Sequence, residues 1–461
     1  MAISESPTVL SVESLRTEFP GRVIGPGDAE YDNARTILFG GIDKHPAVII
    51  KVEDANEVAR VIELARQTGL ELAVRCGGHS NAGHSTTEGG ILLDLSLMKA
   101  IEIDEATQTV WAQGGLTAVE LSKATHEHGL AIGFGDTGSV GIGGITTGGG
   151  VGYLVRKHGL TIDSLLAAEV VTADGRLLLV DADSDPDLFW AIRGGGGNFG
   201  VVTNFKYQLH PVDTIVGGML MLPATPASIV GFMAAAAAAP EGLSTIANVM
   251  PAMPMPGVPE DEVGKVVIFG ILCWAGNVEA GEQALAPFRA LGTPIVDMLK
   301  PMPYPEIYPP EDPDYHPLAI SRTMFMDHVD RDVAEVILDH LRSSDASLRA
   351  VQLRPLGGAY ARVPADATAY AHRSSPIMTN LAVFHDGTEA DIKKRTAWVE
   401  ELHRALHQGD DGAYVNFLTD EGPERVRAAY PGKTWDRLVE IKGRYDPTNM
   451  FRLNQNIPTD A

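Results

Sequence analysis

Glycine-rich segments constrain the fold of this chain more than any other feature of its sequence. The 461 residues include 49 glycines, and many of them lie in four segments, RCGGHSNAGHS (75–85), GDTGSVGIGGITTGGGVG (135–152), RGGGGNFG (193–200) and PLGGAY (355–360). Glycine has no Cβ, so the backbone N–H groups of such segments can approach an anion closely. One segment of this kind is explained by a turn, but three in the first half of a chain favour a ligand that carries a diphosphate.

None of the four segments has the spacing of a Rossmann or P-loop fingerprint. The string GIGGITTGGG (141–150) does not open a clear helix within a strand–helix–strand unit, and the sequence GK[ST] is absent. We therefore expect a nucleotide that is held by a different fold.

Short strands and helices alternate through the first half of the chain. Apolar runs predict strands at 47–52, 72–75, 91–95 and 109–113, and helical spacing predicts helices after Asp54 and over 117–128. The turn Ala-Asp-Gly joins two further strands, expected at 169–172 and 177–180. After about Val212 the composition changes, and Pro-rich stretches at 251–259 and 301–317 predict loops in a second domain.

The charge and the apolar content exclude several classes of partner. The formal net charge is −24, and so acidic a surface repels nucleic acid and anionic membrane surfaces. The first residues lack a basic region followed by an apolar core, and no stretch approaches the roughly 20 apolar residues of a membrane span. We expect a soluble, cytoplasmic protein. Cys76 and Cys273 are the only cysteines, so neither a disulfide framework nor a CxxC metal site is expected.

His79 stands out among the 14 histidines because it lies between Gly78 and Ser80, in a loop poorly suited to packing. Taken alone, such a histidine is more often structural or solvent-facing. Cys76 is interpreted as a small buried thiol, since the local pattern places no histidine or acid to activate it.

Several strings together resemble one family over nearly the whole chain. They are VRCGGHSNAG, GGILLDLS, VGIGGITTGGGVGYLVRKHGLTID and DLFWAIRGGGGNFGVVT, followed by YVNF and YDPTNMFRLNQNI. In this order they resemble the berberine bridge enzyme-like branch of the vanillyl-alcohol oxidase superfamily. The resemblance implies an α+β fold with a PCMH-type FAD-binding domain (1–212), a substrate domain with an antiparallel sheet backed by helices (213–404) and a C-terminal element that returns to the FAD domain (405–461).

The resemblance also implies how FAD is held. The histidine at the position of His79 is bonded to the flavin 8α-methyl group, and neutral imidazole is a suitable nucleophile for such a bond. Many relatives add a second bond through a cysteine at the position of Thr137, so we expect a single covalent link. Further cofactor contacts are expected from Arg75, Cys76, Gly77, Gly78, Ser80, Asn81, Gly138, Ser139, Val140, Gly141, Gly144, Thr147, Gly148, Gly152, Val202, Tyr414, Asn416, Asn454 and Asn456.

Two departures from the family bear on catalysis. Phe417 follows the asparagine of the YxN motif and Val151 stands in GGGVG, where relatives often carry a tyrosine that acts as the base or its helper. The candidates that remain near the expected site are Tyr153 and His372, with Arg373, Thr379 and Asn380. None is a convincing strong base. A neutral amine needs no base because its lone pair assists hydride departure, which favours an amine or an already acidic phenol.

We therefore expect an oxidase that takes a hydride from a small organic substrate (an amine, phenol or alcohol) and returns the electrons to dioxygen, as a monomer or a homodimer. Val140 occupies a position that tends to govern oxygen access in this family, and a valine there accompanies oxidase behaviour. Two alternatives remain open: a dehydrogenase that uses a non-oxygen acceptor, and a flavin-bearing protein that has lost catalysis. A metal-dependent hydrolase is disfavoured because the histidines show no HExxH spacing, and no metal is expected.

Overall fold

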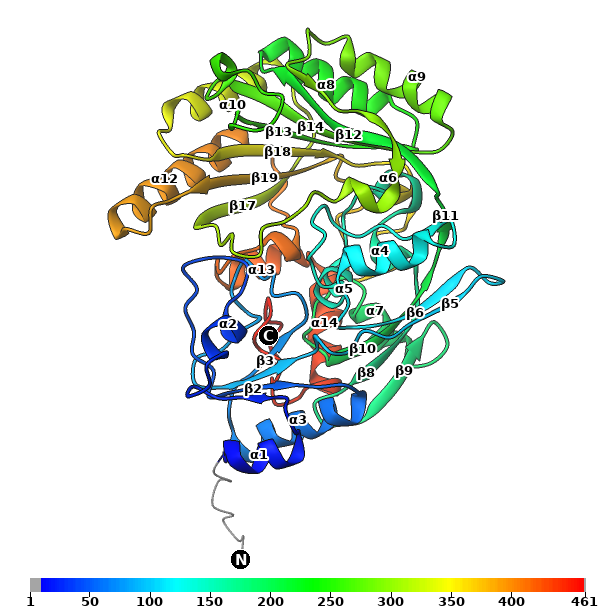
Figure 1. Cartoon of the computed structure of the whole chain (residues 1–461), viewed down its shortest axis with the longest axis vertical. Helices are drawn as coiled ribbons and strands as arrows, with labels where there is room; N and C mark the ends of the chain where they lie inside the picture. Colours follow the sequence, from blue (N-terminus) through cyan, green and yellow to red (C-terminus); the bar gives the residue numbers. More distant parts are fainter. Residues whose placement is uncertain (1–9, 460–461) are drawn as a thin grey trace, which may run out of the picture.

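The first half of the chain forms two main sheets (Figure 1). The structure is a computed structural model that describes residues 10–459, so most of the segment in which we expect no signal peptide lies outside it. In the first sheet, of order β1-β2-β4-β3, the last three strands are parallel. These strands are β1 (Val23–Ile24), β2 (Val48–Lys51), β3 (Leu72–Arg75) and β4 (Ile91–Asp94).

The second sheet is antiparallel and has the order β5-β6-β10-β8-β9. Its strands are β5 (Ile101–Asp104), β6 (Thr109–Gln113), β8 (Leu165–Val171), β9 (Leu177–Asp181) and β10 (Val201–Gln208). A short pair joins β7 (Leu130–Ala131) to β11 (His210–Pro211). The strands that the apolar runs predicted in this half are confirmed.

Helices precede and alternate with these strands along the chain. They are α1 (Val12–Glu18), α2 (Tyr31–Arg35), α3 (Ala55–Thr68), α4 (Ala118–His126), α5 (Ile142–Gly148), α6 (Val155–His158), the 3-10 turn η1 (Thr161–Asp163) and α7 (Pro186–Ala191). The predicted start of α3 is confirmed, because the Asp54 side chain accepts hydrogen bonds from the N–H groups of Asn56 and Glu57. Thr117 caps α4 in the same way.

Helix α5 lies within GIGGITTGGG but is not part of a strand–helix–strand unit, because the flanking strands β7 and β8 belong to different sheets. Glycine is a poor helix former, but Ile142 is fully buried and tertiary packing holds the segment. A Cβ on Gly148 would lie only 2.0 Å from Oδ1 of Asn416. The helix therefore depends on contacts with a distant part of the chain, which local propensity does not reveal.

The second half of the chain builds one large antiparallel sheet, seen at the top of Figure 1. Its order is β15-β12-β14-β13-β18-β19-β17, and β16 pairs with β12. The strands are β12 (Thr214–Pro223), β13 (Leu243–Pro251), β14 (Val266–Ala275), β15 (Val296–Asp297), β16 (Lys300–Pro303), β17 (Ala319–Met326), β18 (Arg349–Pro355) and β19 (Ile377–Phe384). Where domains divide along the chain stays a prediction.

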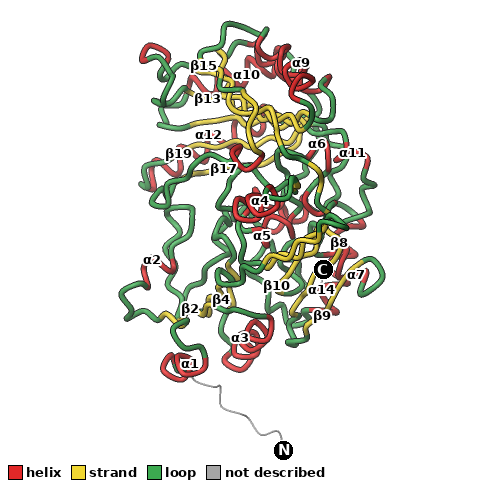
Figure 2. Tube along the Cα trace, turned by 45° about the vertical axis from the view of Figure 1, so that its right-hand side comes forward, coloured by secondary structure: helices red, strands yellow, loops and turns green. Residues whose placement is uncertain are grey.

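Helices cover the face of this sheet that points away from the first half (Figures 1 and 2). They are α8 (Pro226–Ala238), α9 (Val278–Arg289), α10 (Arg331–Ser343) and α12 (Glu389–Leu406). Two shorter elements of this half are η2 (Glu260–Glu262) and α11 (Ala359–Arg362), and α11 contacts α6 of the first half instead. Phe232, Phe288 and Leu338 belong to the hydrophobic cluster between helices and strands. The opposite face of the sheet is thereby left to contact the first half.

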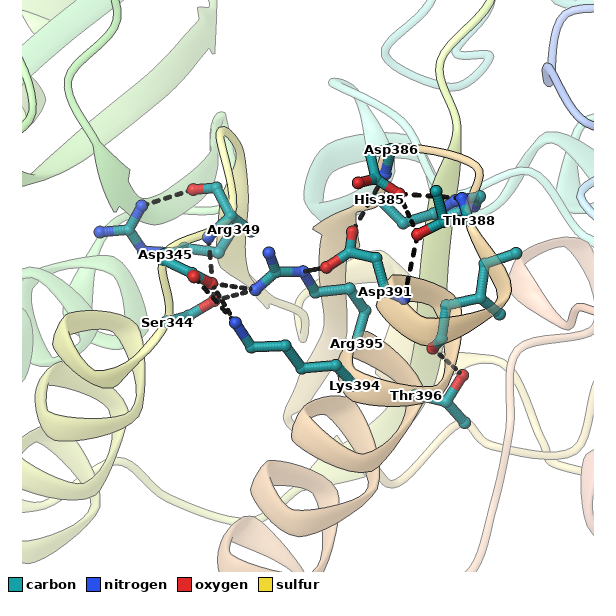
Figure 3. Close-up of polar contacts among 12 residues, drawn as sticks. Ser344, Asp345, Arg349, His385, Asp386, Thr388, Asp391, Lys394, Arg395 and Thr396 are labelled. Carbon is teal, nitrogen blue, oxygen red and sulfur yellow. Dashed lines mark hydrogen bonds and ion pairs between the residues drawn. The ribbon is translucent and has the colours of Figure 1, made fainter.

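Polar contacts fix α12 at its N-terminal end (Figure 3). The hydroxyl of Thr388 caps the helix by accepting a hydrogen bond from Asp391 N–H. The Arg395 guanidinium lies between Asp345, 2.6 Å from its Oδ1, and Asp391, 3.0 Å from its Oδ1. Lys394 adds a second cation beside Asp345 at 2.8 Å. Helix α12 is thus joined to the loop that precedes β18.

Residues 304–318, called here the crossing segment, connect β16 near one edge of the large sheet to β17 at the other edge. The segment begins with the 3-10 turn η3 (Tyr304–Ile307) and runs between the sheet and the first half of the chain (Figure 1). Near its end, the N–H of Gly40 donates a hydrogen bond to the carbonyl oxygen of Pro317 at 3.0 Å. The loop predicted at 301–317 is therefore correct only for residues 308–317, because 301–303 belong to β16 and 304–307 to η3.

The C-terminal part of the chain returns to the first half through η4 (Val415–Phe417), α13 (Pro423–Ala429) and α14 (Lys433–Tyr445). The Lys442 ammonium and the Asp446 carboxylate, both fully buried, lie 2.7 Å apart. Lys442 also donates to the backbone oxygen of Asn198 at 2.8 Å, and Asp446 accepts from the N–H groups of Met450 and Phe451. This buried pair joins the third glycine-rich segment to the C-terminal segment. None of the helices within residues 10–459 is long and apolar enough to cross a membrane.

Asp446→Asn should lower the free energy of unfolding by about 3–5 kcal/mol, because it leaves the Lys442 ammonium buried without its counter-ion. Urea denaturation followed by tryptophan fluorescence measures the change. Asp187→Asn is the matched control: Asp187 pairs with Arg437 and Arg444 at the surface, and loss of an exposed pair costs about 1 kcal/mol or less. Equal losses in both variants would contradict this interpretation of the buried pair.

Candidate active site

A cavity of about 440 Å³ lies where the glycine-rich segments of the first half meet the large sheet and the C-terminal segment. Its wall takes residues from the first three glycine-rich segments, from β18 and β19, and from residues 414–418 and 453–455. Cofactor sites commonly occupy about 300–1,000 Å³. The cavity is therefore large enough for a bound cofactor.

Backbone rather than side chains forms much of this wall. A Cβ on Gly77 would lie 2.3 Å from the backbone nitrogen of Gly141, so the first two glycine-rich segments touch through their backbones. A Cβ on Gly197 would lie 2.9 Å from Oδ1 of Asn454, which brings the C-terminal segment against the third glycine-rich segment. Backbone N–H groups in such contacts are suited to a diphosphate. The residues present thus fit a dinucleotide such as FAD.

His79 lies on the wall of the cavity. Its Nε2 is 2.8 Å from Oγ of Ser139. Burial lowers the pKa of the His79 imidazole, although the nearby carboxylates of Glu311 and Asp136 oppose this shift. The ring is therefore neutral at pH 7 and keeps a nucleophilic lone pair.

No reactive thiol competes with His79. Burial raises the pKa of Cys76 to about 11, and its thiol donates to the backbone oxygen of Gly114 at 2.6 Å. Cys273, fully buried, has a pKa raised to about 12 for the same reason. Both cysteines are thus protonated at neutral pH. Cys76 is half-buried, whereas the sequence analysis interpreted it as a buried thiol. Thr137, at which the sequence analysis expected no second covalent link, lines the cavity.

Most of the predicted cofactor residues reach the cavity. Its wall includes Cys76, Gly77, Gly78, His79, Ser80, Asn81, Thr137, Val140, Gly141, Gly144, Thr147, Val202, Tyr414, Asn416 and Asn454. Their contacts with a cofactor stay predictions, but the fold brings them to one place.

The other predicted cofactor residues lie behind the wall, and they are Arg75, Gly138, Ser139, Gly148, Gly152 and Asn456. Arg75 pairs with the buried Asp94 at 2.6 Å and so joins β3 to β4. Gly152 allows a close approach, because a Cβ there would lie 1.3 Å from the backbone oxygen of Phe134. These two residues support the wall, and the structure gives them no surface on the cavity.

Neither predicted base, Tyr153 nor His372, is part of the cavity wall. The Tyr153 hydroxyl donates to the backbone oxygen of Asp136 at 3.2 Å, and burial raises its pKa well above 10. His372 Nε2 donates to the backbone oxygen of Ala429 at 3.0 Å, and its ring stacks on Phe325. A Cβ on Gly412 would lie 2.8 Å from His372 Nδ1, so that face is also covered. This geometry does not support a proton-transfer role for either side chain.

Asp136, Arg354 and Gln352, which the sequence analysis did not single out, form a polar group at the cavity beside Asn380, which it did name. Asp136 forms a short ion pair with Arg354, whose side chain is only 5% exposed. The Arg354 guanidinium also donates through Nε to Oε1 of Gln352 at 2.7 Å and lies over the ring of Phe417. Asn380 lines the cavity nearby, and its Oδ1 is buried without a hydrogen-bond partner in the described range. These groups can bind the polar part of a substrate.

Some of these residues could have been identified from the sequence. Asp136 lies inside the second glycine-rich segment. Gln352 and Arg354 are two residues apart on β18, so they share one face of the sheet. The sequence alone did not show which face of β18 meets the cavity, and this is why both residues were missed.

Comparisons with known proteins bear on this site. Residues 46–181 match the family described as FAD binding domain, and residues 413–458 match the family described as Berberine and berberine like. An FAD-linked oxidoreductase of Dictyostelium discoideum is 32% identical over 426 residues, covering 89% of this chain and 88% of that protein. The (R)-6-hydroxynicotine oxidase of Paenarthrobacter nicotinovorans is 31% identical over 458 residues, covering 96% and 97%. The crystal structure of 6-hydroxy-D-nicotine oxidase from Arthrobacter nicotinovorans is 28% identical, with a TM-score of 0.84 and coverage of 96% and 98%.

Proposed function

The chain belongs to the berberine bridge enzyme-like family of FAD-linked oxidoreductases, and we propose that it holds FAD covalently through His79 alone and oxidises a small amine. The observation that carries this proposal is the position of His79 on the wall of a cavity made from three glycine-rich segments. The glycine-rich segments and His79 would hold FAD, which would supply an acceptor for the substrate hydride and would allow the electrons to pass to dioxygen as hydrogen peroxide. A cytoplasmic location and a monomeric or homodimeric state stay predictions.

The cavity wall supports a substrate that needs no strong base. Phe417 and Val151, the two positions at which relatives often carry a tyrosine, both line the cavity. Tyr414 also lines it, but its hydroxyl accepts hydrogen bonds from Gly150 N–H and from the Asn416 amide, and burial raises its pKa. The wall therefore offers no phenolate at neutral pH. A neutral amine assists hydride departure with its own lone pair.

An alcohol or phenol is the second candidate substrate, and Asp136 favours it. Oδ2 of Asp136 accepts from Arg354, whereas Oδ1 has no hydrogen-bond partner among residues 10–459. A carboxylate with a free oxygen on the cavity wall can accept a hydroxyl proton, and such a positioned base contributes about 10²–10⁴-fold in rate.

Acid-denatured protein should keep its flavin, because a covalent bond survives unfolding. Mass spectrometry of a digest should find the flavin only on the peptide that contains His79, since Thr137 offers no thiol and both cysteines are protonated. His79→Ala should release all of the flavin on denaturation while still binding it before. Flavin that leaves the wild-type protein entirely on denaturation would refute the covalent link.

Val140→Leu should slow reoxidation of the reduced flavin by about tenfold, equivalent to about 1.4 kcal/mol of barrier. Val140 lines the cavity, and the extra methylene would obstruct the path of dioxygen. Stopped-flow measurements of the two half-reactions test this, and substrate reduction of the flavin should stay nearly unchanged. Equal slowing of both half-reactions would mean that Val140 shapes the whole site. Slow reoxidation already in the wild type would favour a dehydrogenase that uses another acceptor.

Flavin reduction should become faster as pH rises, because only the deprotonated amine donates hydride. The inflection should follow the pKa of the amine, so anaerobic reduction by two amines of different pKa should give two different inflections. An inflection that stays fixed and disappears in Asp136→Asn would favour the alcohol or phenol. The other titratable side chains on the cavity wall are Cys76, His79, His84, Arg354 and Tyr414. Failure of any substrate to bleach the flavin would favour a protein that has lost catalysis.

A further inference from the structure

A chain of hydrogen bonds connects His79 to the carboxylate of Glu311. Nε2 of His79 lies 2.8 Å from Oγ of Ser139. The Ser139 hydroxyl forms a short hydrogen bond with Oε2 of Glu311, and the Ser139 N–H donates to Oε1 at 2.9 Å. The Glu311 carboxylate thus accepts hydrogen bonds from both donors of Ser139, its hydroxyl and its backbone N–H.

Glu311 reaches this position because the crossing segment carries it over the first half of the chain. Upstream of Glu311, the Tyr308 side chain packs against Gly138, and a Cβ on that glycine would lie 3.3 Å from Tyr308 Cβ. Downstream, Nδ1 of His316 donates to the backbone oxygen of Leu38 at 3.2 Å. Contacts on both sides of Glu311 therefore hold it beside the second glycine-rich segment.

The direction of these hydrogen bonds fixes the tautomer of His79. An ionised carboxylate only accepts hydrogen bonds, so the Ser139 hydroxyl donates its proton to Glu311. The Ser139 oxygen then accepts from Nε2–H of His79, which leaves Nδ1 of the neutral ring unprotonated. Nδ1 has no hydrogen-bond partner in the described part of the chain. The ring therefore presents a free lone pair.

Glu311 has no ion-pair partner among residues 10–459. Among residues 10–459, the hydrogen bonds of its carboxylate come from Ser139 alone. The side chain is exposed, so it does not fill space in a core. Its negative charge favours the protonated form of the His79 ring. Such a carboxylate is free to accept a proton through Ser139.

We propose that Ser139 and Glu311 are positioning residues for attachment of the flavin: they hold His79 with Nδ1 as the nucleophile and accept the Nε2 proton when the bond forms. This inference rests on the proposed covalent link through His79. It assigns a function to Glu311, which lies in a different part of the chain from every residue that the glycine-rich segments contribute. The arrangement parallels hydrolytic triads, in which a carboxylate orients a histidine.

The step balances as follows. A bond forms between Nδ1 of His79 and the 8α carbon, and one C–H bond of the 8α-methyl group breaks. The two electrons of that bond enter the flavin and its hydrogen leaves as a proton, while the Nε2 proton passes through Ser139 to Glu311. Dioxygen then takes the two electrons and two protons and becomes hydrogen peroxide, which restores the oxidised flavin.

The test measures the rate of attachment in protein produced under riboflavin limitation and then supplied with FAD in air. Covalent flavin is read from its fluorescence in denaturing gels and from the mass of the intact protein. Glu311→Gln keeps the acceptor for Ser139 N–H but removes the charge, and Ser139→Ala removes the hydroxyl. Both variants should attach flavin at least about tenfold more slowly than the wild type, as expected when a positioned proton acceptor is lost.

Two control variants separate this role from a structural one. Glu306→Gln makes the same substitution at an exposed position of the crossing segment, away from Ser139, and should attach flavin at the wild-type rate. Ser139→Thr keeps a hydroxyl and should restore attachment. Thermal stability and the affinity for non-covalent FAD, measured in a His79→Ala background, should be the same with and without Glu311→Gln.

Each outcome bears on the inference. Wild-type rates in both Glu311→Gln and Ser139→Ala would overturn it while leaving the covalent link intact. Slow attachment together with weaker FAD binding or lower stability would also overturn it, because the residues would then act on the fold. Wild-type protein without any covalent flavin would overturn the proposed link itself, and this inference with it. As an independent readout, ¹⁵N shifts of the His79 ring in flavin-free protein should show an unprotonated Nδ1 in the wild type and a mixture of tautomers in Ser139→Ala.

Discussion

The structure depends on a backbone contact that only glycine permits. The first two glycine-rich segments meet at Gly77 and Gly141, where a Cβ on Gly141 would lie 2.3 Å from Sγ of Cys76. Any side chain here would push the segments apart, and with them His79 and Ser139, whose polar atoms now lie 2.8 Å from each other. The dense glycine of the sequence therefore does more than make turns. These glycines set the distance between the two backbone segments that form this part of the cavity wall.

On the opposite wall, the large sheet supplies charge rather than backbone. Arg354 reaches across from β18 and forms its ion pair with Asp136 of the glycine-rich wall, so the two halves of the chain are bound electrostatically at the cavity itself. Because the side chain of Arg354 is almost fully buried, its charge needs this partner. The pair leaves the cavity wall close to neutral at this point. A neutral substrate enters such a site without losing strong solvation.

The sequence predicted those parts of the site that lie within short contiguous segments. His79 and the residues beside it reach the cavity because their segment is contiguous, and the Asp54 cap of α3 follows from a local rule. The failures share one cause, which is dependence on distant contacts. His372 was expected near the site from its place in the chain, but the fold turns its ring toward Phe325 and the backbone of Ala429. Helix α5 was not among the predicted helices, because its stability comes from packing.

The crossing segment implies an order in which the parts of the site come together as the chain folds. Glu311 is 172 residues further along the chain than Ser139, and the loop that carries it is anchored on strands at opposite edges of the large sheet. During synthesis, the glycine-rich segments emerge long before that sheet can form. The imidazole therefore acquires its complete set of partners only after the later strands have paired. A polypeptide with a misfolded second half would present the same histidine without its carboxylate. Under the proposed role of Glu311, such a chain would acquire covalent flavin more slowly than a chain in which both halves have reached their native arrangement.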